Sequence, residues 1–318
     1  MTAASESSAA DRDRVIEEIR RELQVRRRPR TIEELSAQLE PLSVGLTQRV
    51  PVLFRGTRMF RTRKMQSKPS YIHEIGAPPA DVTPIGRLNA IRQSVLYLAD
   101  SPDTAFSESR AISGEFCLSE WSVTAEKLAA ANGGLSADTL ALRFPKEVHE
   151  GEGVPPLPGA DDEKALGLFR EIYTLDVGQD GLLYAWSIAC GRVNGFSHAC
   201  DRVAVEMPDG MTKWEGRCPY GAITYPSVRM EKPSLNYALN DHGRRHVEIR
   251  NLQWVRRLGD GSYTSLDFAD SWGSEGRIAW KGRPARFKLK PGEAAKVTKV
   301  TETSWRYETP DGSIPWFV

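Results

Sequence analysis

The sequence predicts a mixed α/β (α+β) protein in which short strands form a central sheet and helices accompany it. Two observations favour this class. Through the middle of the chain, compact apolar runs typical of buried strands, at 50–54 and 94–99, alternate with helical and loop segments. Two further stretches, GAITY at 221–225 and HVEIRNLQWV at 246–255, also have the pattern of extended chain.

The composition excludes several broad classes of function. The chain has 318 residues, 43 basic and 42 acidic side chains, and a formal net charge of +1. A protein that coats DNA or an anionic membrane needs a large positive field, so nucleic acid is an unlikely partner for the core and no membrane association is expected. No basic and apolar signal segment is visible, and the most apolar run, at 182–190, is too short to span a bilayer. The four cysteines form no CxxC pair, which is typical of reduced thiols in a cytoplasmic protein.

The first part of the chain is predicted to be a helical extension over residues 1–44. The Ala/Ser-rich first ten residues are expected to be disordered. Residues 11–24 then have apolar side chains at helical spacing, and TIEE at 31–34 is a capping box that starts a second helix. Pro41 is expected to stop that helix, and the basic run between the two helices is interpreted as a solvated linker.

The central domain is predicted over residues 45–257, with an insertion at about 125–215. Within the insertion, residues 144–163 are rich in proline, glycine and acids, which indicates a surface loop or hinge. From residue 258 to 318, short β-like runs are separated by DG, KG and PG turns, which indicates a small β element of hairpins.

Three segments place a polar side chain at a strand end or on a capped helix. Arg55 directly follows the first apolar run, and Ser227 follows the strand that Pro226 ends. Between them, the strand 94–99 leads into SPDTAFSE, where Ser101 is a candidate N-cap, followed by proline and aspartate at positions that suit a helix start. Each segment alone is a weak signal.

Together, and in this order, LFRGTR, GRLN, VLYLADSPDTAFSESR and ITYPSVR resemble the RES-domain family, which is named for its arginine, glutamate and serine. The resemblance covers roughly residues 48–255. The family's second motif usually reads GGRWN, whereas here Ile85 replaces the first glycine and Leu88 the tryptophan. The resemblance implies a fold similar to ADP-ribosyltransferases. It also implies a role as a bacterial toxin of a toxin–antitoxin pair that degrades cellular NAD, so we expect NAD as the substrate and a cognate antitoxin or activating protein as a partner.

The resemblance also implies the catalytic roles. Breaking the nicotinamide–ribose bond creates an oxocarbenium-like cation, which a carboxylate stabilises, and Glu108 is the matching residue. Arg55 and Arg87 are the candidates for the pyrophosphate, since guanidinium groups bind such anions in a bidentate way. Ser227 is expected to hold the nicotinamide amide or the attacking nucleophile.

Two further residues complete the expected NAD site. Tyr97 is expected to stack on the nicotinamide or to bond the ribose, and Asn89 to assist in the same loop. No GxGxxG motif follows a strand, so NAD is expected as a substrate, with water or inorganic phosphate as acceptor, and not as a hydride carrier. No cofactor and no metal are expected. His242 and His246 have helical spacing, and Cys190, His198 and Cys200 lie close in sequence, but neither set has the pattern of a zinc site.

Two alternatives to NAD hydrolysis stay open at this stage. A mono-ADP-ribosyltransferase would use the same site and transfer ADP-ribose to a protein or nucleic acid. In a non-catalytic binding module, the basic C-terminal hairpins with Trp280, Trp305 and Trp316 would contact RNA or protein.

Overall fold

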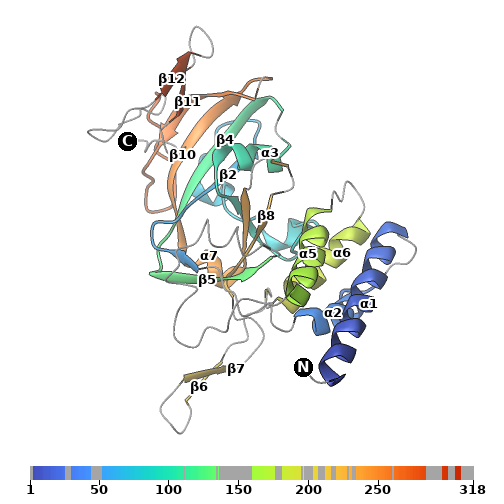
Figure 1. Ribbon diagram of the computed structural model, residues 1–318. Helices are drawn as coiled ribbons and strands as arrows, with labels where there is room; N and C mark the ends of the chain where they lie inside the picture. The colour runs from blue at the N-terminus through green and yellow to red at the C-terminus, as the bar shows by residue number, and fades with distance from the viewer. Residues whose placement is uncertain are drawn as a thin grey trace. The chain divides into compact units, whose positions relative to one another are not determined.

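The computed structural model has the mixed α/β architecture that the sequence predicts. Nine strands are ordered β1-β5-β8-β9-β3-β2-β4-β10-β11 in one mixed sheet. Figure 1 traces the helices and strands along the chain. The structure describes residues 3–25, 30–43, 52–110, 112–133, 135, 160–175, 181–194, 196, 203–206, 212–215, 220–227, 229–230, 234–259, 261–283, 296–299 and 305–308.

The chain divides into two compact units, and each is described by itself. Unit 1 comprises Met1–Thr57, Ala77–Asp100 and Ser122–Glu248. Unit 2 comprises Arg58–Gly76, Ser101–Trp121 and Ile249–Val318. Because each unit is assembled from three separate stretches, neither coincides with a segment predicted from the sequence, and the predicted boundaries near residues 44 and 257 stay a prediction.

The first helix of unit 1, α1, runs from Ala3 to Val25. Its predicted apolar stripe is buried, with Ile16 and Ile19 almost fully enclosed. The expectation that the first ten residues are disordered is wrong, because the helix already begins at Ala3. Alanine is the strongest helix former, and the early alanines extend the helix that the stripe anchors.

The second helix, α2, runs from Ile32 to Ser43 and has the predicted capping box. The Glu34 amide donates to Thr31 Oγ1 at 3.2 Å, and the Thr31 amide donates to the Glu34 carboxylate at 3.0 Å. The expectation that Pro41 stops the helix is wrong, since the helix continues for two residues beyond it. The proline removes a single intrahelical hydrogen bond, and the fully buried Leu42 anchors the last turn.

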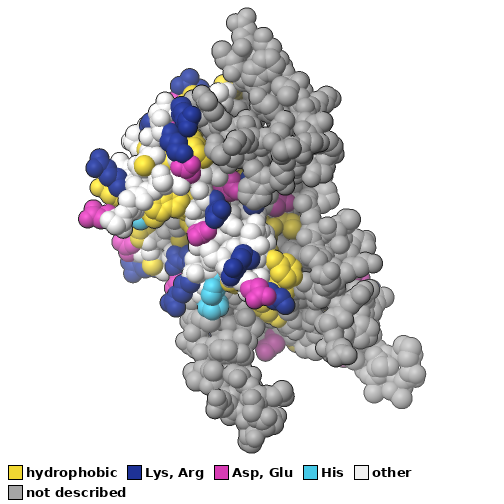
Figure 2. All heavy atoms as spheres, turned by 90° about the vertical axis from the view of Figure 1, so that its left-hand side faces the viewer, with side chains coloured by type: hydrophobic (Ala, Val, Ile, Leu, Met, Phe, Trp, Pro, Cys, Tyr) yellow, Lys and Arg dark blue, Asp and Glu magenta, His cyan; other side chains and the backbone are white. Residues whose placement is uncertain are grey.

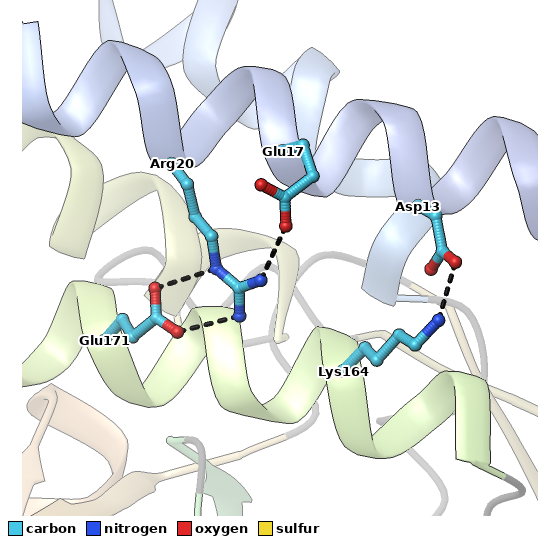
Figure 3. Close-up of polar contacts among 5 residues, drawn as sticks. All are labelled: Asp13, Glu17, Arg20, Lys164 and Glu171. Atoms are coloured by element: carbon cyan, nitrogen blue, oxygen red, sulfur yellow. Dashed lines mark hydrogen bonds and ion pairs between the residues drawn. The ribbon is translucent and has the colours of Figure 1, made fainter.

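Two further helices, α5 (Ala160–Thr174) and α6 (Gly181–Val193), pack with α1 and α2 around one apolar cluster of unit 1. Charged contacts join α1 to α5 at the surface (Figure 3). The Arg20 guanidinium binds the Glu171 carboxylate through Nε at 3.1 Å and Nη2 at 2.8 Å, and Lys164 Nζ lies 2.6 Å from the Asp13 carboxylate. Since α5 begins at Ala160, the predicted loop 144–163 ends earlier than expected, and residues 144–159 lie outside the described residues.

Five strands of the sheet belong to unit 1: β1 (Val52–Phe54), β5 (Lys127–Asn132), β8 (Ala222–Pro226), β9 (Leu235–Leu239) and β3 (Leu96–Ala99). β5 and β8 are parallel, and the other pairs in this group are antiparallel. The register aligns one side chain from each of four neighbouring strands, and all four contact the apolar cluster with the helices: Ala131, Ile223, Ala238 and Tyr97. This row therefore identifies the helix-covered face of the sheet.

Unit 2 contains β2 (Arg58–Lys64), most of β4 (Gly114–Val123) and β10 (Val247–Arg257), and all of β11 (Tyr263–Ala269) and the short helix α3 (Pro102–Glu108). Phe106 is fully buried under α3, and Thr62 Oγ1 of β2 donates to the Ala105 carbonyl of the helix at 2.8 Å. β11 pairs with β10, so a strand of the main sheet lies in the segment for which the sequence predicts a separate β element.

The remaining elements are small. Two antiparallel hairpins join β6 (Val203–Glu206) to β7 (Thr212–Glu215) and β12 (Lys296–Lys299) to β13 (Trp305–Glu308). The second one confirms a predicted C-terminal hairpin. There are also one short α-helix and two 3₁₀ turns: α7 (Asp241–Arg244), η2 (Ile72–Glu74) and η3 (Ala80–Val82).

The surface agrees with the balanced composition. On the face shown in Figure 2, basic and acidic side chains of the described residues are interspersed, without a broad field of one sign. None of the helices described here is both long enough and apolar enough to cross a bilayer.

Candidate functional site

Tyr97 and Asn89 form a hydrogen-bond network that holds the Gly86–Asn89 loop against β3. The Tyr97 hydroxyl accepts a hydrogen bond from the Leu88 amide at 2.9 Å and donates to Asn89 Oδ1 at 2.8 Å. The buried Asn89 Nδ2 donates to the carbonyls of Pro84 and Ala90 at 2.7 and 3.0 Å. Burial raises the pKa of Tyr97 well above its usual value, so the hydroxyl stays protonated and can donate.

Gly86 allows this network to form. A Cβ at residue 86 would lie 2.3 Å from Asn89 Oδ1, which is too close for the present arrangement, and 3.1 Å from the Tyr97 hydroxyl, which is tight. The Gly86 and Asn89 backbones also pair as an isolated bridge, with the Gly86 amide 2.9 Å from the Asn89 carbonyl. Gly86 is therefore explained by the close approach of the Asn89 and Tyr97 side chains to its backbone. The neighbouring residues in the sequence do not reveal this reason.

Arg87, which the sequence assigns to the pyrophosphate, contacts the carboxyl end of α5. Its Nη1 donates to the Tyr173 carbonyl, and its Nη2 donates to the Leu175 carbonyl at 3.1 Å. The last carbonyls of a helix have no intrahelical partner, and a cation there is favoured by the helix dipole. Arg87 thus joins the loop to α5 through two of its guanidinium nitrogens.

Leu88 stands where the resembling family has tryptophan, and it packs tightly against α6. It is 1% exposed, and its Cδ2 lies 2.9 Å from the position that a Cβ on Gly191 would take. The helix can approach the loop this closely because residue 191 has no side chain.

Ser227 and Asp100 lie at the same edge of the sheet. β3 and β8 both pair antiparallel with β9, so their carboxyl ends point the same way. The Ser227 amide donates to the Ser234 carbonyl at 2.8 Å, and its Oγ accepts from the Arg229 amide at 3.3 Å. The Asp100 carboxylate accepts from the Leu235 amide at 3.0 Å. Asp100 was not selected from the sequence, although a carboxylate directly after a buried strand is a signal that could have found it.

Arg55 is not brought to that edge. Its backbone amide donates to the Glu126 carbonyl at 3.2 Å, just before β5 begins, and its side chain is exposed. Because β5 and β8 are parallel, the start of β5 and the end of β8 lie at opposite edges of the sheet. The register separates Arg55 from Ser227 by about nine residue positions, or roughly 30 Å along the strands at about 3.3 Å per residue. The structure therefore does not bring these two residues together.

Glu108 belongs to unit 2, where it is the last residue of α3 and is half-buried. The helix start agrees with the sequence: Ser101 is the N-cap, its Oγ accepts from the Thr104 amide at 3.1 Å, and Pro102 occupies the first turn. Phe106 anchors the helix, because its ring packs against Phe116, Tyr263 and the Arg257 guanidinium. A short, capped and packed helix fixes the position of its last carboxylate.

Two other constellations were considered from the sequence as metal sites, His242 with His246 and Cys190 with His198 and Cys200. Among the described residues, no three His, Cys, Asp or Glu side chains gather as metal ligands would. His242 and His246 contact each other edge to face, with ring centroids 4.9 Å apart. Cys190 is a buried free thiol, as is Cys117, while His198 and Cys200 lie outside the described residues.

The sequence and the structure were compared with known protein families, curated proteins and solved structures. No protein-family model and no curated protein match the sequence. A solved structure with some likeness is the crystal structure of the M. tuberculosis MbcT–MbcA toxin–antitoxin complex, which has a TM-score of 0.35 and 12% sequence identity. The likeness covers 69% of this chain and 95% of that chain. At this TM-score it carries no argument about the fold or the activity of the present protein.

Proposed function

We propose that this protein cleaves the nicotinamide–ribose bond of NAD and releases nicotinamide and ADP-ribose. The observation that carries the proposal is the Tyr97–Asn89 network. It holds the Gly86–Asn89 loop, which carries Arg87 and Asn89 of the RES-like motifs, against Tyr97 of β3. Such a network positions polar groups before a substrate arrives, which is the main way in which protein groups lower a barrier of this kind.

In this proposal Glu108 is the residue nearest to the chemistry. As the glycosidic bond breaks, positive charge develops on the ribose, and a fixed carboxylate stabilises that charge. Water is the acceptor in the simplest form of the reaction, since no second substrate is needed. Inorganic phosphate in place of water would give ADP-ribose 1-phosphate and the same free nicotinamide.

The remaining residues have binding and positioning roles. Arg87 is proposed to contact the pyrophosphate with the donors that α5 does not use. Ser227 is proposed to hold the nicotinamide amide at the edge of the sheet. Tyr97 and Asn89 are positioning residues, because their polar groups already bond the loop. Arg55 keeps only the assignment from its sequence motif, and its position at the other sheet edge argues against direct contact with the same substrate group as Ser227.

At the cellular level we propose that the protein is a toxin whose NAD cleavage is restrained by a cognate antitoxin or released by an activating partner. This part rests on the resemblance of its motifs to the RES-domain family. Uncontrolled NAD loss would arrest the host, so a cell that carries such an enzyme needs a means to inhibit it.

The test is an incubation of the purified full chain with NAD alone, followed by chromatography of nicotinamide, ADP-ribose and ADP-ribose 1-phosphate with and without added phosphate. We expect stoichiometric nicotinamide release without a macromolecular acceptor. Glu108→Gln should lower kcat by at least about 100-fold, the usual size of the loss when one transition-state-stabilising group is removed. Asp103→Asn, on the exposed start of the same helix, is the matched charge control and should retain most of the activity.

Three outcomes would change the conclusion. Nicotinamide release that requires a protein or nucleic acid, with ADP-ribose attached to it, would identify a transferase. Full activity of folded Glu108→Gln would remove Glu108 from the mechanism. Finding no NAD turnover in any of these conditions would favour the non-catalytic binding module.

A further inference from the structure

The segment around β2 is strongly basic. Residues 55–68, RGTRMFRTRKMQSK, contain six lysines and arginines and no acid. Within unit 2, two of these cations have carboxylate partners from other strands. Arg58 Nε lies 2.6 Å from Glu120, and Lys68 Nζ lies 2.6 Å from Asp267. Neither ion pair includes Arg61 or Arg63, the two arginines in the middle of β2.

Arg61 and Arg63 have only main-chain partners. Two residues apart on β2, they project from the same face of the strand. Arg61 Nη1 donates to the Gly76 carbonyl at 2.8 Å, and Arg63 Nη1 donates to the Glu74 carbonyl. Among the described residues, no carboxylate lies within ion-pair distance of either guanidinium. Both side chains are therefore held in place by one turn, residues 74–76, without being neutralised.

The groups around the pair offer no counter-charge. The Glu74 carboxylate accepts hydrogen bonds from the Ser70 and Tyr71 amides at 2.9 and 2.7 Å and forms no ion pair with either arginine. Cys117 also lies close to Arg63, but burial raises the pKa of its thiol to about 12, so it is neutral at physiological pH. The two guanidinium groups thus form a site with an excess of positive charge.

Burial makes this excess unfavourable in the free protein. Desolvation, together with the neighbouring charge of Arg63, lowers the pKa of Arg61 to about 10. Each guanidinium has five N–H donors, and one of each is used by the turn. Both side chains are only partly buried, and neither has a fully enclosed, unpartnered nitrogen among the described residues.

We propose that Arg61 and Arg63 form a binding site for the phosphate group of a small phosphorylated molecule. Two planar guanidinium forks, already fixed at one end, match the oxygens of a phosphate or pyrophosphate group, and a bound dianion balances both charges. The site does not depend on NAD cleavage. Thr62, between the two arginines, points to α3, so the pair lies on the strand face away from the helix of Glu108.

The experiment is isothermal titration calorimetry of the full chain with inorganic phosphate, pyrophosphate and ADP in chloride buffer at constant ionic strength. The three titrants distinguish a free anion from a nucleotide source. We expect binding that prefers pyrophosphate or ADP to phosphate, gives no heat with adenosine and persists in Arg87→Ala, which lacks the arginine proposed to bind NAD. A short single-stranded RNA that binds more tightly than pyrophosphate would overturn the assignment to a small molecule.

The variants are Arg61→Gln with Arg63→Gln, and Arg277→Gln as the matched control on an exposed arginine of the same unit. The double variant should weaken binding by at least about tenfold, which corresponds to the loss of one or two charge-assisted hydrogen bonds. Unchanged affinity in the double variant, or an equal loss in Arg277→Gln, would refute the site. If the glutamines prevent folding, Arg61→Lys with Arg63→Lys keeps both charges but removes the forks, and wild-type affinity in that variant would also refute it.

Discussion

Several side chains that the motifs mark as substrate ligands also make hydrogen bonds that hold the Gly86–Asn89 loop in place. Asn89 is 2% exposed, and its amide group serves the loop's own carbonyls and the Tyr97 hydroxyl. A residue of this kind affects a reaction by holding its neighbours in place. Its substitution should therefore change stability and activity together, whereas a pure ligand would change activity alone.

Tyr97→Phe tests this distinction. Loss of the hydroxyl leaves the Leu88 amide and Asn89 Oδ1 without their partner in a buried setting. We expect the free energy of unfolding to fall by about 1–3 kcal/mol, the cost of leaving such groups unsatisfied. Urea denaturation followed by tryptophan fluorescence measures it. Tyr71→Phe is the control, because Tyr71 is exposed and its hydroxyl makes no hydrogen bond among the described residues. Equal losses in both variants would contradict the role of the network.

Asp267 gives a prediction about pH. Although burial opposes it, the hydrogen bonds from Lys68 Nζ at 2.6 Å and from two main-chain amides hold the pKa of Asp267 below its usual value. A carboxylate with a lowered folded-state pKa stabilises the fold above its unfolded pKa of about 3.9, and this stability is lost as the pH falls through the folded value.

The Asp267→Asn variant should therefore be less stable than wild type at pH 7 and should lose less stability between pH 5 and pH 3. Thermal melts across that range, followed by circular dichroism, measure both effects. Asp270→Asn is the control, since Asp270 is more exposed and pairs only with Lys281. Parallel pH profiles for wild type and Asp267→Asn would show that another carboxylate causes the acid sensitivity.

At the scale of elements, α1 is connected to the Gly86–Asn89 loop through α5. Arg20 of α1 binds Glu171 near the carboxyl end of α5 (Figure 3). Arg87 of the loop binds the last carbonyls of the same helix. The ionic contact is partly exposed, with side chains 33% and 48% exposed, so it contributes less than the buried Ile16 and Ile19. Apolar burial keeps α1 on α5, and the ion pair adds orientation.

A double-mutant cycle of Arg20→Gln and Glu171→Gln measures the ionic part. We expect a coupling free energy of about 0.5–1 kcal/mol, because the contact is bidentate but solvent-screened. The more exposed pair Arg14–Asp11, at 69% and 67%, is the internal control and should give a coupling near zero. A coupling in the first pair as small as in the second would mean that α1 is held by apolar contacts alone.

Local signals in the sequence predicted the local structure well. The capping box before α2, the N-cap of α3 and the buried strands β3 and β8 follow from residues that are neighbours in the chain. The strand β2 was missed because RMFRTRK contains four cations among seven residues and so has no apolar run. Its burial comes from partners far away in sequence, such as Glu120 for Arg58.

The arrangement of the candidate site could not be predicted in the same way. Arg55 and Ser227 each follow a strand, and this pattern suggested one site. Their separation depends on the parallel pairing of β5 with β8, which is set by contacts between residues far apart in the sequence. We therefore expect Arg55→Ala to lower kcat/KM for NAD less than Arg87→Ala does. Kinetics on both purified variants measure this difference, and a loss in Arg55→Ala equal to that in Arg87→Ala would contradict the register argument.

For the whole molecule, the near balance of 43 basic and 42 acidic residues means that positive charge matters only where acids are locally absent. Arg87 at the end of α5 and the pair Arg61 and Arg63 on β2 are two such places. If both proposals hold, the protein binds small anions at these two places, and its balanced surface gives no broad field that would attract polyanions. Its effect on a cell should then come from what it does to a small molecule.

The last prediction concerns that effect. If the protein hydrolyses NAD, induced expression in a bacterial host should lower total cellular NAD before growth stops, since the enzyme consumes a metabolite that many pathways share. Glu108→Gln, expressed to the same level, should leave both NAD and growth unchanged, and Asp103→Asn should behave as wild type. An enzymatic cycling assay for NAD, sampled together with culture density, gives the order of events. Growth arrest at normal NAD would instead indicate modification of a macromolecule, and arrest by Glu108→Gln equal to wild type would show that toxicity does not depend on this carboxylate.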